Sequence, residues 1–260
     1  MLSRVQELNQ LFIIGRLPEN KFYASPRALE ELARLNTISV NKNPPIWEQT
    51  YDWSIKISVL NIRSIMKHFD DLKEDSVLMY SDVICLTETW LKIDSAVDQL
   101  NMCGYQLHTN SARDGKGIMI YYKIDTVSPV ISITKLKYQI SMLKSSDIDI
   151  IAVYRSQGAE DLDIARDIEN ILEHQKMTII CGDFNICYQE QRKNVIFNKL
   201  DDFGFLQLVR EATHLKGGNI DQVWSNHNHR TVKVDVALYS PYYVCDDHDA
   251  ICTTVRKAQS

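Results

Sequence analysis

Residues 177–185 read MTIICGDFN, a run of mostly apolar and β-branched residues that ends abruptly at Gly182, Asp183 and Asn185. A short apolar run of this kind is typical of a strand buried on both faces of a sheet. The polar residues follow where such a strand gives way to a loop, and proteins often place reactive side chains there. The stretch therefore predicts a buried strand that ends in a carboxylate and an amide.

The same pattern recurs on both sides of this stretch. Three segments have helical spacing, namely 64–79, 162–172 (with Leu162, Ala165, Ile168 and Leu172 on one face) and 194–203. So many strands with so few helices do not fit a simple alternating parallel fold, and we expect a core of two packed sheets with helices outside. The further strands are predicted at 55–61, 82–87, 117–122, 130–134, 140–143, 148–154, 206–210, 220–225, 231–238 and 250–255.

Several of these strands also begin or end at polar residues. Each residue taken alone is most simply a strand-end turn, but the set has the residue types that bind a hard cation and move a proton. If the carboxylates converged, two charges ~4 Å apart would repel by about 4 kcal/mol at an effective dielectric of about 20, so the cluster would need a cation or a proton. Oxygen ligands favour Mg²⁺ or Mn²⁺, and the cysteines and histidines lack zinc-site spacing. The residues are Asn61, Glu88, Asp183, Asn185, Asp221, Asp247 and His248.

Composition narrows the class of protein. The 260 residues carry a net charge of −5, with 45% hydrophobic and 24% charged residues, which is an ordinary globular mixture. The negative charge argues against a protein that grips nucleic acid mainly by bulk positive charge. The six cysteines form no CxxC pair and indicate reduced thiols in an intracellular protein. No apolar run approaches the length of a membrane span, so no membrane association is expected.

Five short motifs stand in order along the chain: NIRS (61–64), TETW (87–90), GDFN (182–185), NID (219–221) and DDHDAI (246–251). Together they resemble the motif set of the endonuclease/exonuclease/phosphatase superfamily, the group of deoxyribonuclease-I-like and abasic-site endonucleases. The segments GKGIMIYY (115–122) and AVYRSQ (152–157) also resemble intermediate strands of that superfamily. The similarity is greatest to the endonuclease domains of mobile elements and spans roughly residues 53–256.

The resemblance implies a fold and a metal site. The fold is an α/β four-layer α-β-β-α sandwich of two mixed sheets. The activity is hydrolysis of DNA phosphodiester bonds with Mg²⁺ or Mn²⁺. By the same resemblance, Glu88 would be the principal metal ligand, Asn61 would lie beside it, and Asp247 would complete the metal side.

The resemblance also implies catalytic roles. Asp183 would orient or deprotonate the attacking water, and Asn185 would hold the phosphate and the nucleophile. Asp221 would hydrogen-bond His248, and His248 would face the scissile phosphate. Tyr154 would contact the phosphate oxygens. An equally simple interpretation is a core tyrosine whose hydroxyl reaches solvent.

The roles of some residues in or near the motifs stay undecided. Asp246 stands where the superfamily usually has Ser or Thr, and an added carboxylate would either strengthen cation binding or repel a DNA phosphate. Arg63 would meet a DNA phosphate or remain a solvated arginine. Thr213 and His214 fall in the loop before NID, where a plain loop role is the simpler interpretation.

The N-terminal segment contains none of these motifs. Residues 1–35 resemble the C-terminal end of a superfamily-1 DNA helicase, with LSRV (2–5) similar to its last ATPase motif and Arg4 as the phosphate-contacting arginine. No G-x-x-x-x-G-K-[ST] loop occurs in the chain, so no ATP binding is expected. A helicase tail followed by this endonuclease resembles the C-terminus of a Helitron-type transposon protein. We expect a helicase remnant at 1–36, a linker at 37–52 and the endonuclease domain at 53–260; an unrelated strand–helix extension is the alternative for the first segment.

The leading hypothesis is a metal-dependent DNA endonuclease, derived from a transposable element and acting in the nucleus. One alternative is a phosphatase or phosphodiesterase of the same superfamily that acts on a lipid or inositol phosphate. The other is a catalytically decayed fragment that only binds nucleic acid. The presence of every polar motif residue speaks against decay of the site, whereas the missing helicase body speaks for decay of the parent protein.

Overall fold

The computed structural model describes residues 54–257 except 92–96, 112–115, 124–127, 174–175, 228–231, 242–243 and 246, and except the side chains of 128–130 and 257. The expected helicase remnant, the linker and Asp246 lie outside the described residues. The domain boundaries proposed for them stay predictions.

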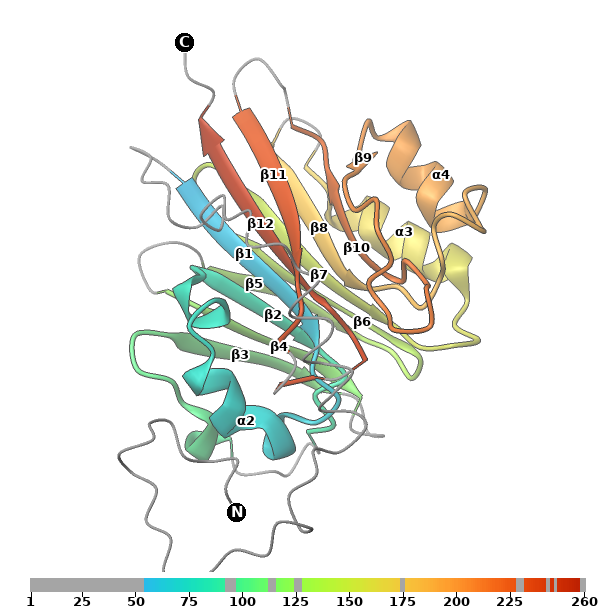
Figure 1. Cartoon of the computed structure of the whole chain (residues 1–260). Coiled ribbons are helices and arrows are strands. Elements are labelled where there is room, and N and C mark those ends of the chain that lie inside the picture. The colour runs from blue at the N-terminus through green and yellow to red at the C-terminus, as the bar shows by residue number, and fades with distance from the viewer. Residues whose placement is uncertain are drawn as a thin grey trace, which may run out of the picture. The chain divides into compact units, whose positions relative to one another are not determined.

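Two six-stranded sheets form the centre of the molecule (Figure 1). β1 pairs in parallel with β2, and β7 pairs in parallel with β8, whereas the other pairs are antiparallel. Both sheets are therefore mixed, as predicted. The first sheet has the order β11 (Val232–Tyr239), β12 (Ala250–Lys257), β1 (Ser54–Asn61), β2 (Val83–Thr87), β4 (Gly117–Tyr122), β3 (Gln106–Ser111). The second has the order β5 (Ser128–Thr134), β6 (Tyr138–Lys144), β7 (Asp149–Arg155), β8 (Thr178–Asp183), β10 (Asp221–Ser225), β9 (Leu206–Gln207).

Side-chain alternation along the strands builds the core between the sheets. On β1, Ile57 and Val59 belong to the cluster that joins the two sheets, whereas Leu60 belongs to the cluster on the outer face. On β8, Cys181 faces inward and Ile180 outward. This two-residue period is the ordinary consequence of pleated strands, and both faces of each sheet are covered.

Helices supply the two outer layers. The helices are α2 (Ile65–Glu74), α3 (Asp161–Ile171) and α4 (Val195–Asp202), with 3₁₀ turns η5 (Leu78–Tyr80) and η6 (Asp98–Leu100). Leu72 of α2 packs in the outer cluster of the first sheet. Ile168 of α3 and Phe197 of α4 pack in the outer cluster of the second. The expected four-layer α-β-β-α sandwich is confirmed (Figure 1).

Two details of the sequence analysis were wrong. Leu162 is 60% exposed rather than buried, because Ile164, Ala165 and Ile168 form the face of α3 that packs on the sheet. Strand β3 was not predicted, since its sequence QLHTNS has Leu107 as its only apolar residue. β3 pairs with β4 alone at the edge of the first sheet, where a strand needs less apolar surface.

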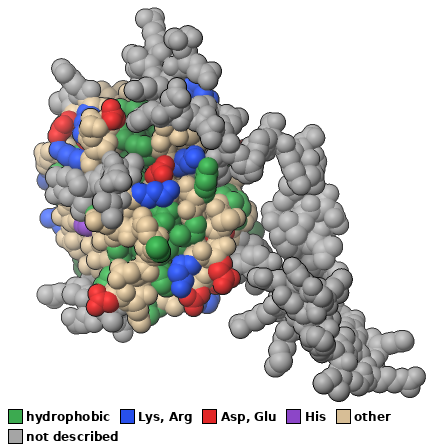
Figure 2. Space-filling model, turned by 90° about the vertical axis from the view of Figure 1, so that its left-hand side faces the viewer, with side chains coloured by type: hydrophobic (Ala, Val, Ile, Leu, Met, Phe, Trp, Pro, Cys, Tyr) green, Lys and Arg blue, Asp and Glu red, His purple; other side chains and the backbone are tan. Residues whose placement is uncertain are grey.

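The distribution of surface charge and the state of the cysteines agree with what the composition indicates. On the face in Figure 2, lysine, arginine and acidic side chains are scattered among apolar and neutral ones. On the described part of that face, therefore, neither positive nor negative side chains predominate. All six cysteines fall within the described residues and are free thiols. Among the helices described, none has the length and apolar character needed to cross a membrane.

Candidate active site

Four strands carry inward-facing rows of apolar side chains. At one end of the sandwich, each of these rows ends in a polar side chain. On β8, for example, Asp183 follows the inward-facing Cys181 by two positions, so pleating alone turns its side chain into the space between the sheets. The sequence therefore sets the direction of each side chain, and the packing of the sheets brings them together. The residues are Asn61 on β1, Tyr154 on β7, Asp183 on β8 and Asp221 on β10.

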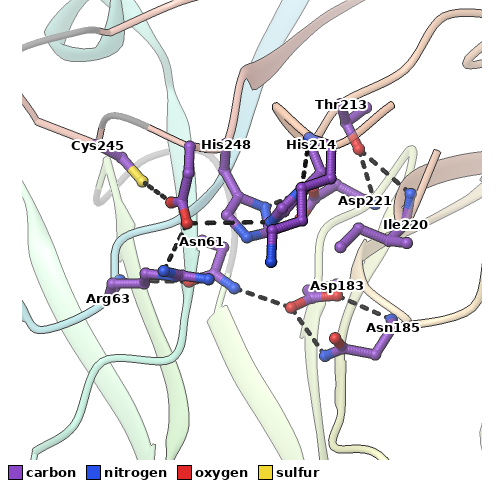
Figure 3. A network of polar contacts seen from close by, with 12 residues as sticks. Asn61, Arg63, Asp183, Asn185, Thr213, His214, Ile220, Asp221, Cys245 and His248 are labelled. Atoms are coloured by element: carbon purple, nitrogen blue, oxygen red, sulfur yellow. Dashed lines mark hydrogen bonds and ion pairs between the residues drawn. The ribbon is translucent and has the colours of Figure 1, made fainter. Parts of the chain in front are cut away.

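The strand register lines up three of these residues. Asp183 is the cross-strand partner of Tyr154 on β7 and of Asp221 on β10. Asn61 comes from the other sheet, and its Nδ2 donates to Asp183 Oδ2 at 2.9 Å (Figure 3). This hydrogen bond joins the two sheets at the centre of the site.

Asp183 is fully buried and held from several sides. Its Oδ1 accepts from the backbone N–H of Asn185 at 2.8 Å, and its Oδ2 accepts from Asn185 Nδ2 at 3.0 Å. Burial raises the pKa of Asp183 well above its ordinary value, the nearby charge of Asp221 raises it further, and Glu88 adds to the effect. The carboxylate is thus oriented by its hydrogen bonds and made more basic by its surroundings.

The glycine of GDFN has a backbone reason. Gly182 adopts φ +140°, and a Cβ there would lie 1.9 Å from the carbonyl oxygen of Val153 on β7. Any side chain would push β8 away from its parallel neighbour and displace Asp183. Asn185 adopts φ +49°, and its Nδ2 also donates to Arg155 O at 2.8 Å, which fixes the turn after the strand.

Glu88 follows the end of β2 with φ +49° and is half-buried. The hydroxyl of Tyr154 donates to Glu88 Oε1 at 3.3 Å. Both side chains line an open cavity of about 440 Å³ whose wall also includes Arg63 and Asn185. Tyr154 is therefore both a buried tyrosine and a member of the site.

Asp221 and His248 form a buried pair. Nδ1 of His248 lies 2.8 Å from Oδ2 of Asp221, and the backbone N–H of Asp221 donates to Thr213 Oγ1 at 3.0 Å. Burial by itself lowers the pKa of His248, but the hydrogen bond and charge of Asp221 outweigh it, so the pKa is raised. The pair that was expected from the resemblance is thus brought together.

The carboxylate of Asp247 has two side-chain partners of its own. Its Oδ2 pairs with Arg63 Nη1 at 2.5 Å, and its Oδ1 accepts from Cys245 Sγ at 3.3 Å (Figure 3). The backbone N–H of Arg63 donates to Asn61 Oδ1 at 3.2 Å, so Arg63 lies between the two. The structure therefore places Arg63 in the site, an option that the sequence left open.

His214, for which a plain loop role was the simpler interpretation of the sequence, lies beside His248 in the structure. Its ring meets the ring of His248 edge-on, with centroids 4.7 Å apart, and its Nε2 lies 3.9 Å from Asp247 Oδ2. Burial and the charge of His248 lower its pKa. The dipeptide Thr213–His214 carried no signal beyond its place before NID.

Three side chains carry the kinds of donor atom that a hard divalent cation binds. Glu88, Asn61 and Asp247 offer carboxylate and amide oxygens, which are the ligands that magnesium and manganese prefer. The negative charges of Glu88 and Asp221 both act on the buried Asp183 and raise its pKa. A bound cation would relieve that repulsion.

Known structures share this fold at low sequence identity. The endonuclease domain of TRAS1, a telomere-specific non-LTR retrotransposon, is 12% identical with a TM-score of 0.60, over 78% of this chain and 99% of that one. An AP endonuclease from Archaeoglobus fulgidus is 15% identical with a TM-score of 0.61, over 79% and 100%. A 3'-5' exonuclease from Neisseria meningitidis is 16% identical with a TM-score of 0.59, over 76% and 98%.

A comparison with curated proteins finds no match. The sequence profile of the Endonuclease/Exonuclease/phosphatase family, in contrast, matches residues 53–243, which include Asn61, Glu88, Asp183 and Asp221. That match covers most of the chain and agrees with the two-sheet fold. The chain is a member of the Endonuclease/Exonuclease/phosphatase family.

Proposed function

We propose that this protein is a divalent-metal-dependent endonuclease that hydrolyses DNA phosphodiester bonds. The observation that carries the proposal is the surroundings of Asp183. This buried carboxylate has a raised pKa, is oriented by Asn61 and Asn185, and lies next to the Asp221–His248 pair. A basic group, a proton-bearing histidine and a cavity with cationic side chains in its wall suit phosphodiester hydrolysis.

Asp183 is the group that orients and deprotonates the attacking water. Its two oxygens are fixed by the amides of Asn61 and Asn185, so its lone pairs point in a set direction. Burial, the main cause of its raised pKa, makes this carboxylate a stronger base than an exposed aspartate, as general-base catalysis requires. Such a base contributes typically 10²–10⁴-fold to the rate.

His248 faces the phosphate. Asp221 accepts a hydrogen bond from Nδ1 of His248, which sets the ring orientation and leaves Nε2 as the nitrogen toward the substrate. An N–H donor there stabilises the charge that develops on the phosphoryl oxygens.

Glu88, Asn61 and Asp247 would hold the cation. When bound, Mg²⁺ or Mn²⁺ supplies Lewis-acid stabilisation of the phosphoryl group. The Arg63 guanidinium must then leave Asp247, and with 44% of its side chain exposed it is free to turn toward a substrate phosphate. Tyr154, bonded to Glu88, presents its hydroxyl to the phosphate oxygens.

The cavity beside Glu88 supports a polyanionic substrate. Arg63, Lys116 and Lys137 lie in its wall together with Glu88, although the chain as a whole is acidic. Basic side chains at that wall suit the phosphates that flank a scissile bond. The motifs of mobile-element endonucleases and the likeness to the TRAS1 endonuclease domain support DNA as the substrate and a transposable element as the origin. We propose a nuclear location for such an enzyme.

Supercoiled-plasmid nicking tests the proposal. We expect the purified chain to nick with Mg²⁺ or Mn²⁺, to stop with EDTA, and not to nick with Zn²⁺ alone. Glu88→Gln should lower the rate at least about a hundredfold, because a bound metal contributes several kcal/mol of transition-state stabilisation.

The matched control is Glu74→Gln, a carboxylate on the outer helix α2, which should leave the rate unchanged. Activity that persists in EDTA would remove the metal from the proposal. Release of phosphate from inositol phosphates or phosphorylated lipids, with no plasmid nicking, would favour the phosphatase alternative.

A further inference from the structure

His214 is held by a tight turn. Its N–H donates to Gly218 O at 3.1 Å, and the N–H of Gly217 donates to His214 O at 2.8 Å. Gly217 adopts φ +89°, a conformation that a residue with a side chain rarely adopts. The backbone on both sides of His214 is thus fixed.

The turn is also joined to the segment that carries His248. The N–H of Leu215 donates to Asp247 O at 2.9 Å, and the N–H of Asp249 donates to Thr213 O at 2.8 Å. These bonds make His214 and His248 partners in an antiparallel β-bridge. His214 is therefore positioned as firmly as the histidine that the family motif contains.

The hydrogen bonds identify which ring nitrogen faces the site. The backbone N–H of Lys216 donates to Nδ1 of His214 at 3.0 Å, so Nδ1 is an acceptor and the proton of the neutral ring is on Nε2. Nδ1 of His248 is engaged by Asp221. The nitrogen left for a ligand is therefore Nε2 in both rings, and that of His214 is a donor.

One acceptor atom fits both rings. The ring centroids are 4.7 Å apart, and one nitrogen of each ring lies within 4.8 Å of the other and of an Asp247 oxygen. An N–H···O bond is about 2.9 Å long, so one oxygen bridges two nitrogens as far apart as about 5.8 Å. We take Nε2 as that nitrogen in both rings, since each Nδ1 is already engaged, and a single phosphoryl oxygen can then accept from His214 and His248 together.

The same three side chains, His214, Asp247 and His248, would also suit a transition metal. A metal, however, takes the lone pair of the ring nitrogen that it binds, so Nε2 of His214 would have to lose its proton to Nδ1. Nδ1 could then no longer accept from the N–H of Lys216. The hydrogen-bond donor is the better assignment.

We propose that His214 is a further catalytic residue, whose Nε2–H and the imidazole of His248 together hold one non-bridging oxygen of the scissile phosphate. This inference rests on the proposed function, since it needs a phosphodiester in the same cleft. Two fixed donors at one oxygen stabilise the charge that grows there in the transition state.

Paired variants test the role. His214→Leu should lower kcat by about 10²-fold with little change in KM, since it removes one donor at the developing charge. His214→Gln, which keeps an N–H near the Nε2 position, should recover part of that loss. His108→Leu is the control, because His108 lies on β3 and bonds Ser132 outside the site. Equal losses in the Leu and Gln variants would overturn the proposal.

Phosphorothioate substrates separate a catalytic role from a structural one. Sulfur is a poorer acceptor than oxygen, so one of the Rp and Sp diastereomers should react more slowly with the wild-type protein. That selective slowing should shrink in His214→Leu, because the donor it depends on is gone. Thio effects that are the same in both proteins would overturn the proposal.

Two measurements do not depend on turnover. Nitrogen-15 NMR of the histidine rings should show His214 as the neutral Nε2–H tautomer, and the Nδ1–H tautomer would overturn the donor assignment. Titration with Co²⁺ should give no visible absorption band that disappears in His214→Leu, whereas such a band would show a metal ligand instead. If the tautomer is as expected but no phosphodiester is cleaved, the proposed function fails and the donor assignment stands.

Discussion

At the scale of single residues, the site depends on pairs of residues in which one positions or orients the other. Gly182 lets β8 approach β7, and Asp183 follows in the position where Asn61 and Asn185 bind it. Asp221 fixes the ring of His248. Asp183 and His248 thus each have a buried partner, which is what a rigid site requires.

The Asp221–His248 pair predicts how two mutations combine. If Asp221 acts through His248, Asp221→Asn should lose part of the rate, and adding it to His248→Ala should cost little more, because residues that act as a unit are non-additive. Single-turnover nicking by both single variants and the double variant, with folding checked by circular dichroism, measures this. Multiplicative losses would show that the two residues act independently, and a wild-type rate for His248→Ala would exclude the histidine from the site.

At the scale of elements, Tyr105 ties the connection that leads into β2. Its hydroxyl oxygen lies 2.8 Å from Met79 O and 2.6 Å from Ser81 O, so its one proton is shared between these two carbonyls, on the turn η5 and just after it. Burial, and then the charge of Asp82, raise the pKa of Tyr105 to about 12. This tyrosine holds the start of the strand that delivers Glu88.

Tyr105 therefore predicts a pH dependence of stability. Its hydrogen bonds require the protonated hydroxyl, so their stabilisation is fully present below the ordinary tyrosine pKa of 10 and is lost as pH rises through about 12. Tyr105→Phe should lower the free energy of unfolding by about 1–2 kcal/mol at pH 8. The difference from wild type should shrink between pH 10 and 12.

Urea unfolding of the two proteins across that pH range measures the difference. Tyr80→Phe is the control, because the Tyr80 ring is 48% exposed at the same turn. A difference that is constant from pH 8 to 12 would mean that the Tyr105 hydroxyl contributes nothing through these bonds.

At the scale of the whole molecule, the site is a product of the sandwich. Asn61 and Glu88 come from the first sheet and its loops, Tyr154 and Asp183 from the second, and the Asn61–Asp183 bond crosses between them. Any change that shifts one sheet on the other would separate these groups. Catalysis and folding of the described domain should therefore fail together under denaturation.

Deleting residues 1–50 tests the proposed domain boundary. Nicking should stay within a few-fold of the full chain, because every proposed site residue lies between Asn61 and His248. The melting temperature and the rate of the truncated protein, compared with the full chain, measure this. A truncated protein that does not fold would make the N-terminal segment part of the core and would refute the boundary at residue 52.

The sequence by itself determined most of the strands and the order of the motifs, because these depend on local period and composition. Strand β3 was not predicted, because an edge strand needs little apolar surface. Only the tertiary structure decided which side chains meet: that Asn61 bonds Asp183, that Arg63 takes Asp247, and that His214 lies edge-on to His248. These contacts join residues 34 to 184 positions apart, and the packing of two sheets, rather than any local pattern, sets such distances.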